Sequence, residues 1–147
     1  MIRVILDTNI VVSATLRSGG LPEAVFNLAV DRVVQLCISE PIMAEYEEVL
    51  LRPRFKIHPD KLTTALARIR EAGLLVTPTK PVTVASDPDD NIFLECAAAA
   101  KAQYLVTGNQ GHFPPEVWEQ TQIVTARQFL GDIADMGRND PSAEPTS

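Results

Sequence analysis

The sequence contains few cysteines and no long apolar run. Its 147 residues include two cysteines, Cys37 and Cys96, which lie in apolar stretches without the spacing of metal ligands. We expect both to be buried free thiols. No apolar run is long enough to span a bilayer. The start of the chain, with Arg3 alone before a short apolar run, lacks the layout of a signal peptide. We therefore expect a cytoplasmic protein with no membrane segment.

Basic charge is also in deficit. The formal net charge of −6 argues against a protein that coats nucleic acid through a global positive field. It does not exclude a nuclease, because an acidic metal pocket contributes negative charge until cations bind. Any contact with nucleic acid must then rely on a local basic patch. A glycine-rich phosphate loop is missing after the first apolar run, which argues against a Rossmann nucleotide site.

What the sequence does contain is an apolar run that ends in an acid. Residues from Ile2 to Leu6 are mostly aliphatic, and polarity changes abruptly at Asp7, Thr8 and Asn9. This pattern predicts a buried parallel strand that delivers the Asp7 carboxylate to the edge of a sheet. Ligands of open α/β sheets bind at that edge.

Helix-like and strand-like segments alternate along the chain. Caps and apolar periodicity predict helices over residues 9–14, 21–30, 39–52, 58–73, 92–102 and 126–133. Aliphatic runs predict strands over residues 2–6, 33–38, 74–76, 103–107 and 123–124. The alternation predicts an α/β fold with a parallel sheet covered on both faces.

The chain has the length and composition of one domain, with 46% hydrophobic and 22% charged residues. There is no internal repeat. We expect the domain to cover residues 1–135. Residues 136–147 have almost no apolar content and are predicted to form a disordered tail.

Several polar side chains fall at one edge of the predicted sheet. Strand-to-helix loops of a parallel sheet lie on one side, and the residues placed there are Asp7, Glu45, Asp87, Asp89, Asp90 and Asn109. Clustered carboxylates repel one another unless a positive charge neutralises them. Mg²⁺ or Mn²⁺ would do so, since these ions prefer oxygen ligands. Such a site activates water and stabilises charge on a phosphodiester.

Each of these residues also has a purely structural interpretation. Asp7 could cap the turn that follows it, and Asp87 or Asp90 could cap the alanine-rich helix. Glu45 could be a solvated acid at a helix edge, and Asn109 a turn residue. Only their combination on one side of the sheet favours a metal site.

Five segments of the sequence resemble PIN-domain proteins, and specifically the VapC-like toxins of toxin–antitoxin systems. They occur in the family's order over residues 1–130: VILDTNIVVSA, EYEEVLLRPRF at 45–55, SDPDDNIFLECA at 86–97, YLVTGNQGHF at 104–113 and IVTARQFL at 123–130. The resemblance implies a three-layer α/β/α sandwich with a mainly parallel sheet.

The resemblance also implies a ribonuclease site that uses Mg²⁺ or Mn²⁺. By position, Asp7, Glu45 and Asp90 would be the catalytic, metal-binding acids, with Asp87 as a further metal ligand. The side chains that would supply hydrogen bonds around the metals are those of Thr8, Asn9 and Thr107.

Asn109 departs from the family's pattern. The family's fourth acid usually follows Thr-Gly, and here that position holds Asn109. An amide oxygen can bind a cation but brings no negative charge. The substitution therefore weakens the expectation of a second metal ion and leaves open a protein of low or absent activity.

The function implied by the resemblance is cleavage of single-stranded RNA by a toxin that a cognate antitoxin holds inactive. Water activated at the site would attack the phosphorus and break the P–O3′ bond, which leaves 5′-phosphate and 3′-hydroxyl ends. A homodimer is expected from the family alone.

Residues beside the predicted site have two interpretations each. Arg52, Arg54 and Lys56 could contact RNA phosphates, or form a solvated charged loop. His112 could assist proton transfer, although its Gly and Phe neighbours favour an ordinary loop residue. For Phe113, Trp118 and Tyr46, packing in the core is favoured over stacking on bases.

Two other functions compete with a nuclease. The first is a PIN domain without activity that binds RNA or a partner protein, as Asn109 suggests. The second is a phosphotransfer protein of the haloacid dehalogenase type with Asp7 as nucleophile. The second is disfavoured because such proteins need another Asp two residues later, where this chain has Asn9.

Overall fold

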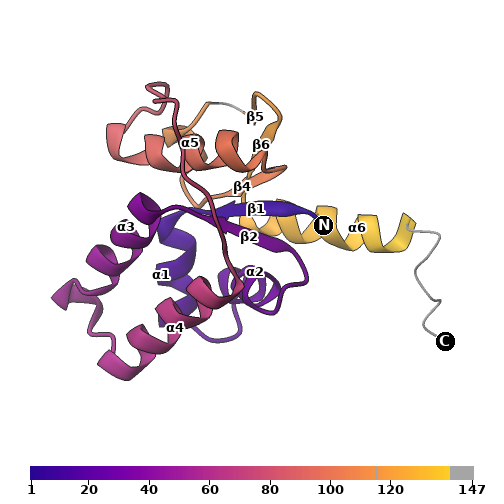
Figure 1. Ribbon diagram of the computed structural model, residues 1–147. Coiled ribbons are helices and arrows are strands. Elements are labelled where there is room, and N and C mark those ends of the chain that lie inside the picture. Colours follow the sequence, from indigo (N-terminus) through magenta and orange to yellow (C-terminus); the bar gives the residue numbers. More distant parts are fainter. Residues whose placement is uncertain (115, 140–147) are drawn as a thin grey trace.

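The computed structural model of the protein describes residues 1–114 and 116–139 and contains one six-stranded sheet (Figure 1). The strand order is β3-β2-β1-β4-β6-β5. All neighbouring pairs are parallel except β5 and β6, which are antiparallel. The strands are β1 (Arg3–Leu6), β2 (Gln35–Ile38), β3 (Leu74–Leu75), β4 (Tyr104–Val106), β5 (Val117–Trp118) and β6 (Thr121–Val124).

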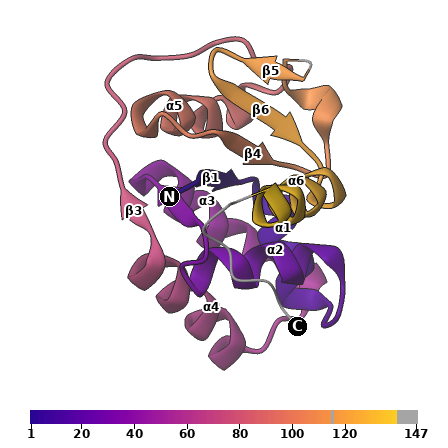
Figure 2. The ribbon, with the colours of Figure 1, turned by 90° about the vertical axis from the view of Figure 1, so that its right-hand side faces the viewer.

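Helices cover both faces of this sheet (Figures 1 and 2). They are α1 (Thr8–Leu16), α2 (Leu21–Val30), α3 (Glu40–Leu50), α4 (Pro59–Ala72), α5 (Asn91–Ala100) and α6 (Ala126–Asn139). Short 3-10 turns occur at η1 (Pro53–Phe55), η2 (Pro88–Asp90) and η3 (Gln110–His112). Helix α5 packs on one face, while α2, α4 and α6 pack on the other with α1 against α2. The predicted three-layer α/β/α sandwich with a mainly parallel sheet is confirmed.

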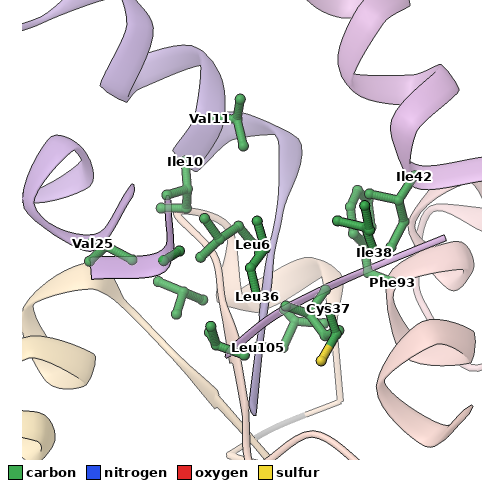
Figure 3. Close-up of a cluster of buried hydrophobic side chains, with 14 of the residues drawn as sticks. Leu6, Ile10, Val11, Val25, Leu36, Cys37, Ile38, Ile42, Phe93 and Leu105 are labelled. Atoms are coloured by element: carbon green, nitrogen blue, oxygen red, sulfur yellow. The ribbon is translucent and has the colours of Figure 1, made fainter. Parts of the chain in front are cut away.

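The core explains why β1 lies in the middle of the sheet. Val4, Ile5 and Leu6 are fully buried, as expected for a strand covered on both faces. In Figure 3, Leu6 lies within the core cluster together with Ile10 of α1 and Phe93 of α5. The cluster thus contains side chains from both helical layers.

The two cysteines are free and buried, as predicted. Burial raises the pKa of Cys96 to about 12 and that of Cys37 to about 11. In the described part of the chain, no helix has the length and apolar character needed to cross a membrane.

Several strands differ from the sequence prediction: β6 begins two residues earlier than predicted, at Thr121, while β1, β3 and β4 are one or two residues shorter. The larger differences concern β2 and β5. Strand β2 begins at Gln35 rather than at residue 33, because Arg32 has a positive φ of 62° in the turn after α2, and Val33 remains 57% exposed. Strand β5 was not expected. Its two residues are too few to show an alternating pattern, and pairing with β6 defines it.

Helix α6 is longer than the sequence suggests. It continues to Asn139, so the first four residues of the predicted disordered tail, 136–139, are helical. Buried Phe129 anchors the helix, and adding a residue to an existing helix requires less free energy than nucleating a new one. The helix can therefore continue into a polar segment. Residues 140–147 of the predicted tail lie outside the described residues.

Candidate active site

Asp7 lies where the central strands β1 and β4 end together. Leu6 pairs with Val106, and the Asp7 backbone N–H donates to the Val106 carbonyl at 2.9 Å. This register places Thr107 beside Asp7, and the Thr107 hydroxyl donates to Asp7 Oδ2 at 2.6 Å. Parallel pairing of two strands about 100 residues apart in the sequence therefore creates the first contact of the site.

The other carboxylate oxygen of Asp7 caps the N-terminus of helix α1. Asp7 Oδ1 accepts a hydrogen bond from the Thr8 backbone N–H at 2.7 Å, so the capping interpretation is correct for one oxygen. Asp7 is only 5% exposed. Burial raises its pKa to about 6 despite the opposing Thr107 hydrogen bond, and the charge of Asp90 raises it further. A nearby cation would relieve this penalty.

Thr8 provides an unsatisfied group next to Asp7. Within the described part of the chain, its buried Oγ1 has no hydrogen-bond partner. Buried polar groups nearly always have partners, and an exception often marks a place where a water or an ion binds. The predicted role of Thr8, a hydrogen bond near a metal, stays a prediction.

Hydrogen bonds connect the loop after β4 to α1 and, through Thr107, to Asp7. The Gly108 backbone N–H donates to Asn9 Oδ1 at 3.0 Å, and the Asn109 backbone N–H donates to Thr107 Oγ1 at 2.9 Å. Thr107 thus links Asp7 to the backbone of Asn109. The side chains of Asn9 and Thr107 support the site through these protein hydrogen bonds.

Asp87 and Asp90 have different local roles. Asp87 Oδ1 accepts from the Asp89 backbone N–H at 3.0 Å and caps η2. Asp90 occupies the N-cap position of α5, but its side chain forms no capping hydrogen bond. The capping interpretation therefore holds for Asp87, although the helix it caps is the 3-10 turn, and does not explain the Asp90 carboxylate.

Asp90 faces His112, a residue that sequence reasoning favoured as an ordinary loop residue. His112 Nδ1 lies 3.3 Å from Asp90 Oδ2. Burial, followed by the charge of Asp87, raises the pKa of Asp90, whereas His112 lowers it. The Ser86 backbone N–H donates to the His112 carbonyl at 2.9 Å and holds the two loops together. The clue in the sequence was the position of His112 three residues after Asn109.

Glu45 reaches the site from α3. It is half-buried, and burial raises its pKa, as do the charges of Glu48 and Asp90, while Arg52 lowers it. The next residue, Tyr46, is fully buried as predicted, and its hydroxyl donates to the Leu6 carbonyl. Leu6 directly precedes Asp7, so this hydrogen bond fastens α3 to the end of β1.

One open pocket of about 360 Å³ brings most of the predicted site residues together. Its lining includes the four acids and the polar and basic groups Asp7, Glu45, Asp87, Asp90, Thr8, Asn9, Asn109, His112, Arg52 and Arg54. Thr107 lies behind Asp7, to which it is hydrogen bonded.

The predicted basic cluster is only partly at this pocket. Arg52 lines it and forms an ion pair with Glu48 at 3.2 Å. Arg54 also lines it, with its guanidinium 4.8 Å from the ring centroid of Phe55. Lys56 is exposed outside the pocket lining, because a positive φ of 50° turns the chain there after η1.

Two aromatic residues that follow β4 pack against the core: Phe113 directly after η3, and Trp118 in β5. Phe113 is buried and Trp118 is partly buried against the core cluster, which agrees with the packing interpretation.

The donor set fits a partly hydrated hard cation. Among residues 1–114 and 116–139, no three Asp, Glu, His or Cys side chains lie close enough to ligate one ion together. Mg²⁺, however, keeps several waters and is usually held by one or two carboxylates. The charge of Asp90 raises the pKa of buried Asp7, and within the described residues the Thr8 hydroxyl lacks a partner. These oxygen donors fit Mg²⁺ or Mn²⁺ bound in that way.

A family model described as "PIN domain" matches residues 3–111. The chain belongs to the PIN-domain family. An uncharacterized protein of Methanocaldococcus jannaschii is 25% identical over 112 residues, covering 74% of this chain and 72% of that protein. PIN domains are generally nuclease domains that typically depend on divalent metal ions, and PIN-domain nucleases in general bind RNA.

Proposed function

We propose that this PIN domain is a Mg²⁺- or Mn²⁺-dependent endoribonuclease that cleaves single-stranded RNA, and that it is the toxin of a toxin–antitoxin pair. The observation that carries the nuclease is the group of acids around one pocket, with raised pKa values for Asp7, Glu45 and Asp90. The VapC-like motifs support the toxin role, and the homodimer and the antitoxin partner rest on the same resemblance.

In this proposal the acidic side chains bind the cation, and Thr107 orients one of them. Asp7, Glu45 and Asp90, with Asp87 and Asn109 nearby, would hold a partly hydrated cation, each either directly or through one of the waters bound to it. When bound, Mg²⁺ or Mn²⁺ supplies water activation and stabilises negative charge on the phosphate. Thr107 keeps the Asp7 carboxylate in one orientation through its hydrogen bond.

Three cationic or polar groups surround that centre. His112 lies beside Asp90, where its imidazole can hydrogen bond to a phosphate oxygen or to the leaving O3′. Arg52 and Arg54 at the rim can contact phosphates of the strand. These contacts would place a local positive patch beside an acidic centre in a chain of net negative charge.

The proposal is tested by cleavage of single-stranded RNA with Mg²⁺ or Mn²⁺ present. Asp7→Asn and Asp90→Asn are expected to abolish cleavage, and the products of the native chain to carry 5′-phosphate and 3′-hydroxyl ends. Asp60→Asn is the matched control, because Asp60 is exposed in the first turn of α4. Unchanged cleavage by Asp7→Asn would refute the mechanism.

Asn109 favours a second candidate, a PIN domain of little or no activity that binds RNA or a protein. Its amide lines the pocket where the family usually has a further acid. If the native chain shows no metal-stimulated cleavage while Asn109→Asp gains it, the nuclease proposal fails for the native chain and this second candidate is supported.

The toxin role needs a separate test in cells. Expression of the chain alone should arrest growth, and co-expression of the protein encoded by the neighbouring reading frame should restore it. Growth arrest by the Asp7→Asn variant as well would separate toxicity from cleavage and contradict the proposal.

A further inference from the structure

A second hollow continues the acidic pocket towards α6. Its volume is about 570 Å³, and it shares the lining residues Asn9, Ser13 and Asn109 with the pocket that contains Asp7. Because the two hollows meet over the same three polar side chains, they form one groove across the carboxyl ends of β1 and β4. We refer to the part beyond Asn109 as the α6 arm of the groove.

The α6 arm differs in chemistry from the acidic pocket. Its described lining contains no acid, and its charged residue is Arg127. One wall is apolar, formed by Leu21, which is 39% exposed, and by Pro22. An arm with one cation and an apolar wall suits a phosphate and its attached nucleoside better than a metal ion.

Arg127 is available for such a contact. Within the described part of the chain its guanidinium has no hydrogen bond or ion pair. Arg52, Arg68 and Arg70, in contrast, are engaged with Glu48, Asp31 and Glu40. An exposed arginine next to the site therefore keeps all its donors for a ligand.

The backbone around Arg127 is held in place relative to Asn109. Thr125 Oγ1 accepts from the Gln128 backbone N–H at 3.1 Å, and Gln128 Oε1 accepts from the Thr125 backbone N–H at 2.9 Å. This capping box fixes the first turn of α6. The Gln110 side-chain amide also donates to Gln128 Oε1 at 3.1 Å, which joins that turn to the loop carrying Asn109.

We propose that a single RNA strand runs through the whole groove, with one phosphate at the acids and a neighbouring phosphate at Arg127. This inference rests on the proposed function and adds a second phosphate contact, at Arg127, to the site. The substrate is an oligonucleotide that occupies both arms, with a nucleoside of the strand against Leu21 and Pro22. Arg127 acts as a positioning residue, distant from the reacting atoms.

Binding in the absence of turnover tests this inference. The Asp7→Asn protein, in buffer with Mg²⁺, is titrated into a fluorescently labelled single-stranded RNA oligonucleotide at several salt concentrations. Arg127→Ala is compared with Arg17→Ala in the same background. Arg17 is exposed at the end of α1 and lines neither part of the groove, so both substitutions remove the same charge.

Arg127→Ala is expected to weaken binding, whereas Arg17→Ala has little effect. For single strands, one lost phosphate contact reduces the steepness of log K against log salt by about 0.7. Extrapolated from about 1 M to about 0.1 M salt, this corresponds to a roughly fivefold weaker association constant for the Arg127→Ala variant. Equal effects of the two substitutions, or no RNA binding by the parent protein, would overturn the inference.

The binding result is independent of the nuclease proposal. If Arg127 proves irrelevant to binding while the native chain still cleaves RNA, only the α6 arm is refuted. If RNA binds through Arg127 but is never cleaved, the arm stands and the catalytic proposal fails.

Discussion

At the residue scale, Asp7 carries a charge that the protein alone does not fully stabilise. Both of its oxygens accept hydrogen bonds, from Thr107 and from the Thr8 backbone. Burial nevertheless outweighs them and raises its pKa to about 6. The exposed Glu40 shows the opposite behaviour, since the hydrogen bond from Arg70 lowers its pKa.

The raised pKa of Asp7 predicts a pH-dependent loss of stability in the metal-free protein. An acid whose pKa is higher in the folded state stabilises that state below its unfolded value, near 4, and this contribution is lost as pH rises through about 6. The loss should be roughly 1–3 kcal/mol. Urea unfolding in chelator at pH 4 and pH 7 should show it in the native chain and show less of it in Asp7→Asn. A difference between the two proteins that does not change with pH would contradict this assignment.

His112 gives a second prediction at this scale. Because its side chain is 49% exposed, His112→Ala should change the free energy of unfolding by less than about 0.5 kcal/mol. Loss of the imidazole beside Asp90 should nevertheless slow RNA cleavage roughly tenfold to hundredfold. His58→Ala is the control, since His58 caps α4 on the exposed surface. Equal rates for the two variants would exclude a role for His112.

At the scale of elements, the contact between α3 and β1 carries Glu45 to the site. Tyr46→Phe removes only the hydroxyl that donates to the Leu6 carbonyl. We expect a loss of about 1–2 kcal/mol in the free energy of unfolding. Cleavage should fall further than this loss explains, because the position of Glu45 depends on the same helix. Rates measured well below the unfolding temperature check this, and an unchanged rate would show that α3 is positioned by packing alone.

The junction of α4 and β3 leaves no room for a side chain at Gly73. An added Cβ would lie 2.7 Å from Ile38 Cδ1 and 2.8 Å from the Ile69 carbonyl oxygen. Gly73→Ala should therefore destabilise the protein by about 1–3 kcal/mol. Gly131→Ala is the matched change in α6, where a Cβ meets nothing within 4 Å. That variant should gain about 0.5–1 kcal/mol in thermal or urea unfolding. Similar results for both would mean that the Ile38 side chain and the backbone at Ile69 both shift to make room.

The elements show which features the sequence could predict. The apolar run before Asp7 predicted β1 because burial on both faces leaves a continuous aliphatic pattern. Strand β5 has no such pattern, since only its pairing with β6 makes it a strand. The extension of α6 also depends on context, because helix propagation begins from an anchored first turn.

At the scale of the whole molecule, metal binding and folding should be coupled. A ligand that binds only the folded state at 100 times its dissociation constant adds about 2.7 kcal/mol of stability. Mg²⁺ or Mn²⁺ should therefore raise the melting temperature of the native chain in a concentration-dependent manner. The effect should be lost in Asp7→Asn and kept in Asp60→Asn. Equal shifts in both variants would indicate non-specific ion binding.

Much of the candidate site was predictable, because the loops that follow parallel strands all lie on one side of the sheet. Asp7, Glu45 and Asp90 line one pocket because loops after parallel strands emerge at one edge. The orientation of side chains within loops was not predictable. Lys56 leaves the pocket at a turn with positive φ, and His112 approaches Asp90 through η3. Such details depend on tertiary contacts between segments distant in the sequence.

The hydrogen bond from Thr107 to Asp7 joins residues separated by 100 positions. Contacts of such long range form late, because closing a long loop costs chain entropy. A chain still being synthesised, in which β4 has not emerged from the ribosome, cannot complete the site around Asp7. The order of synthesis thus keeps the acidic site unassembled until nearly the whole domain is available.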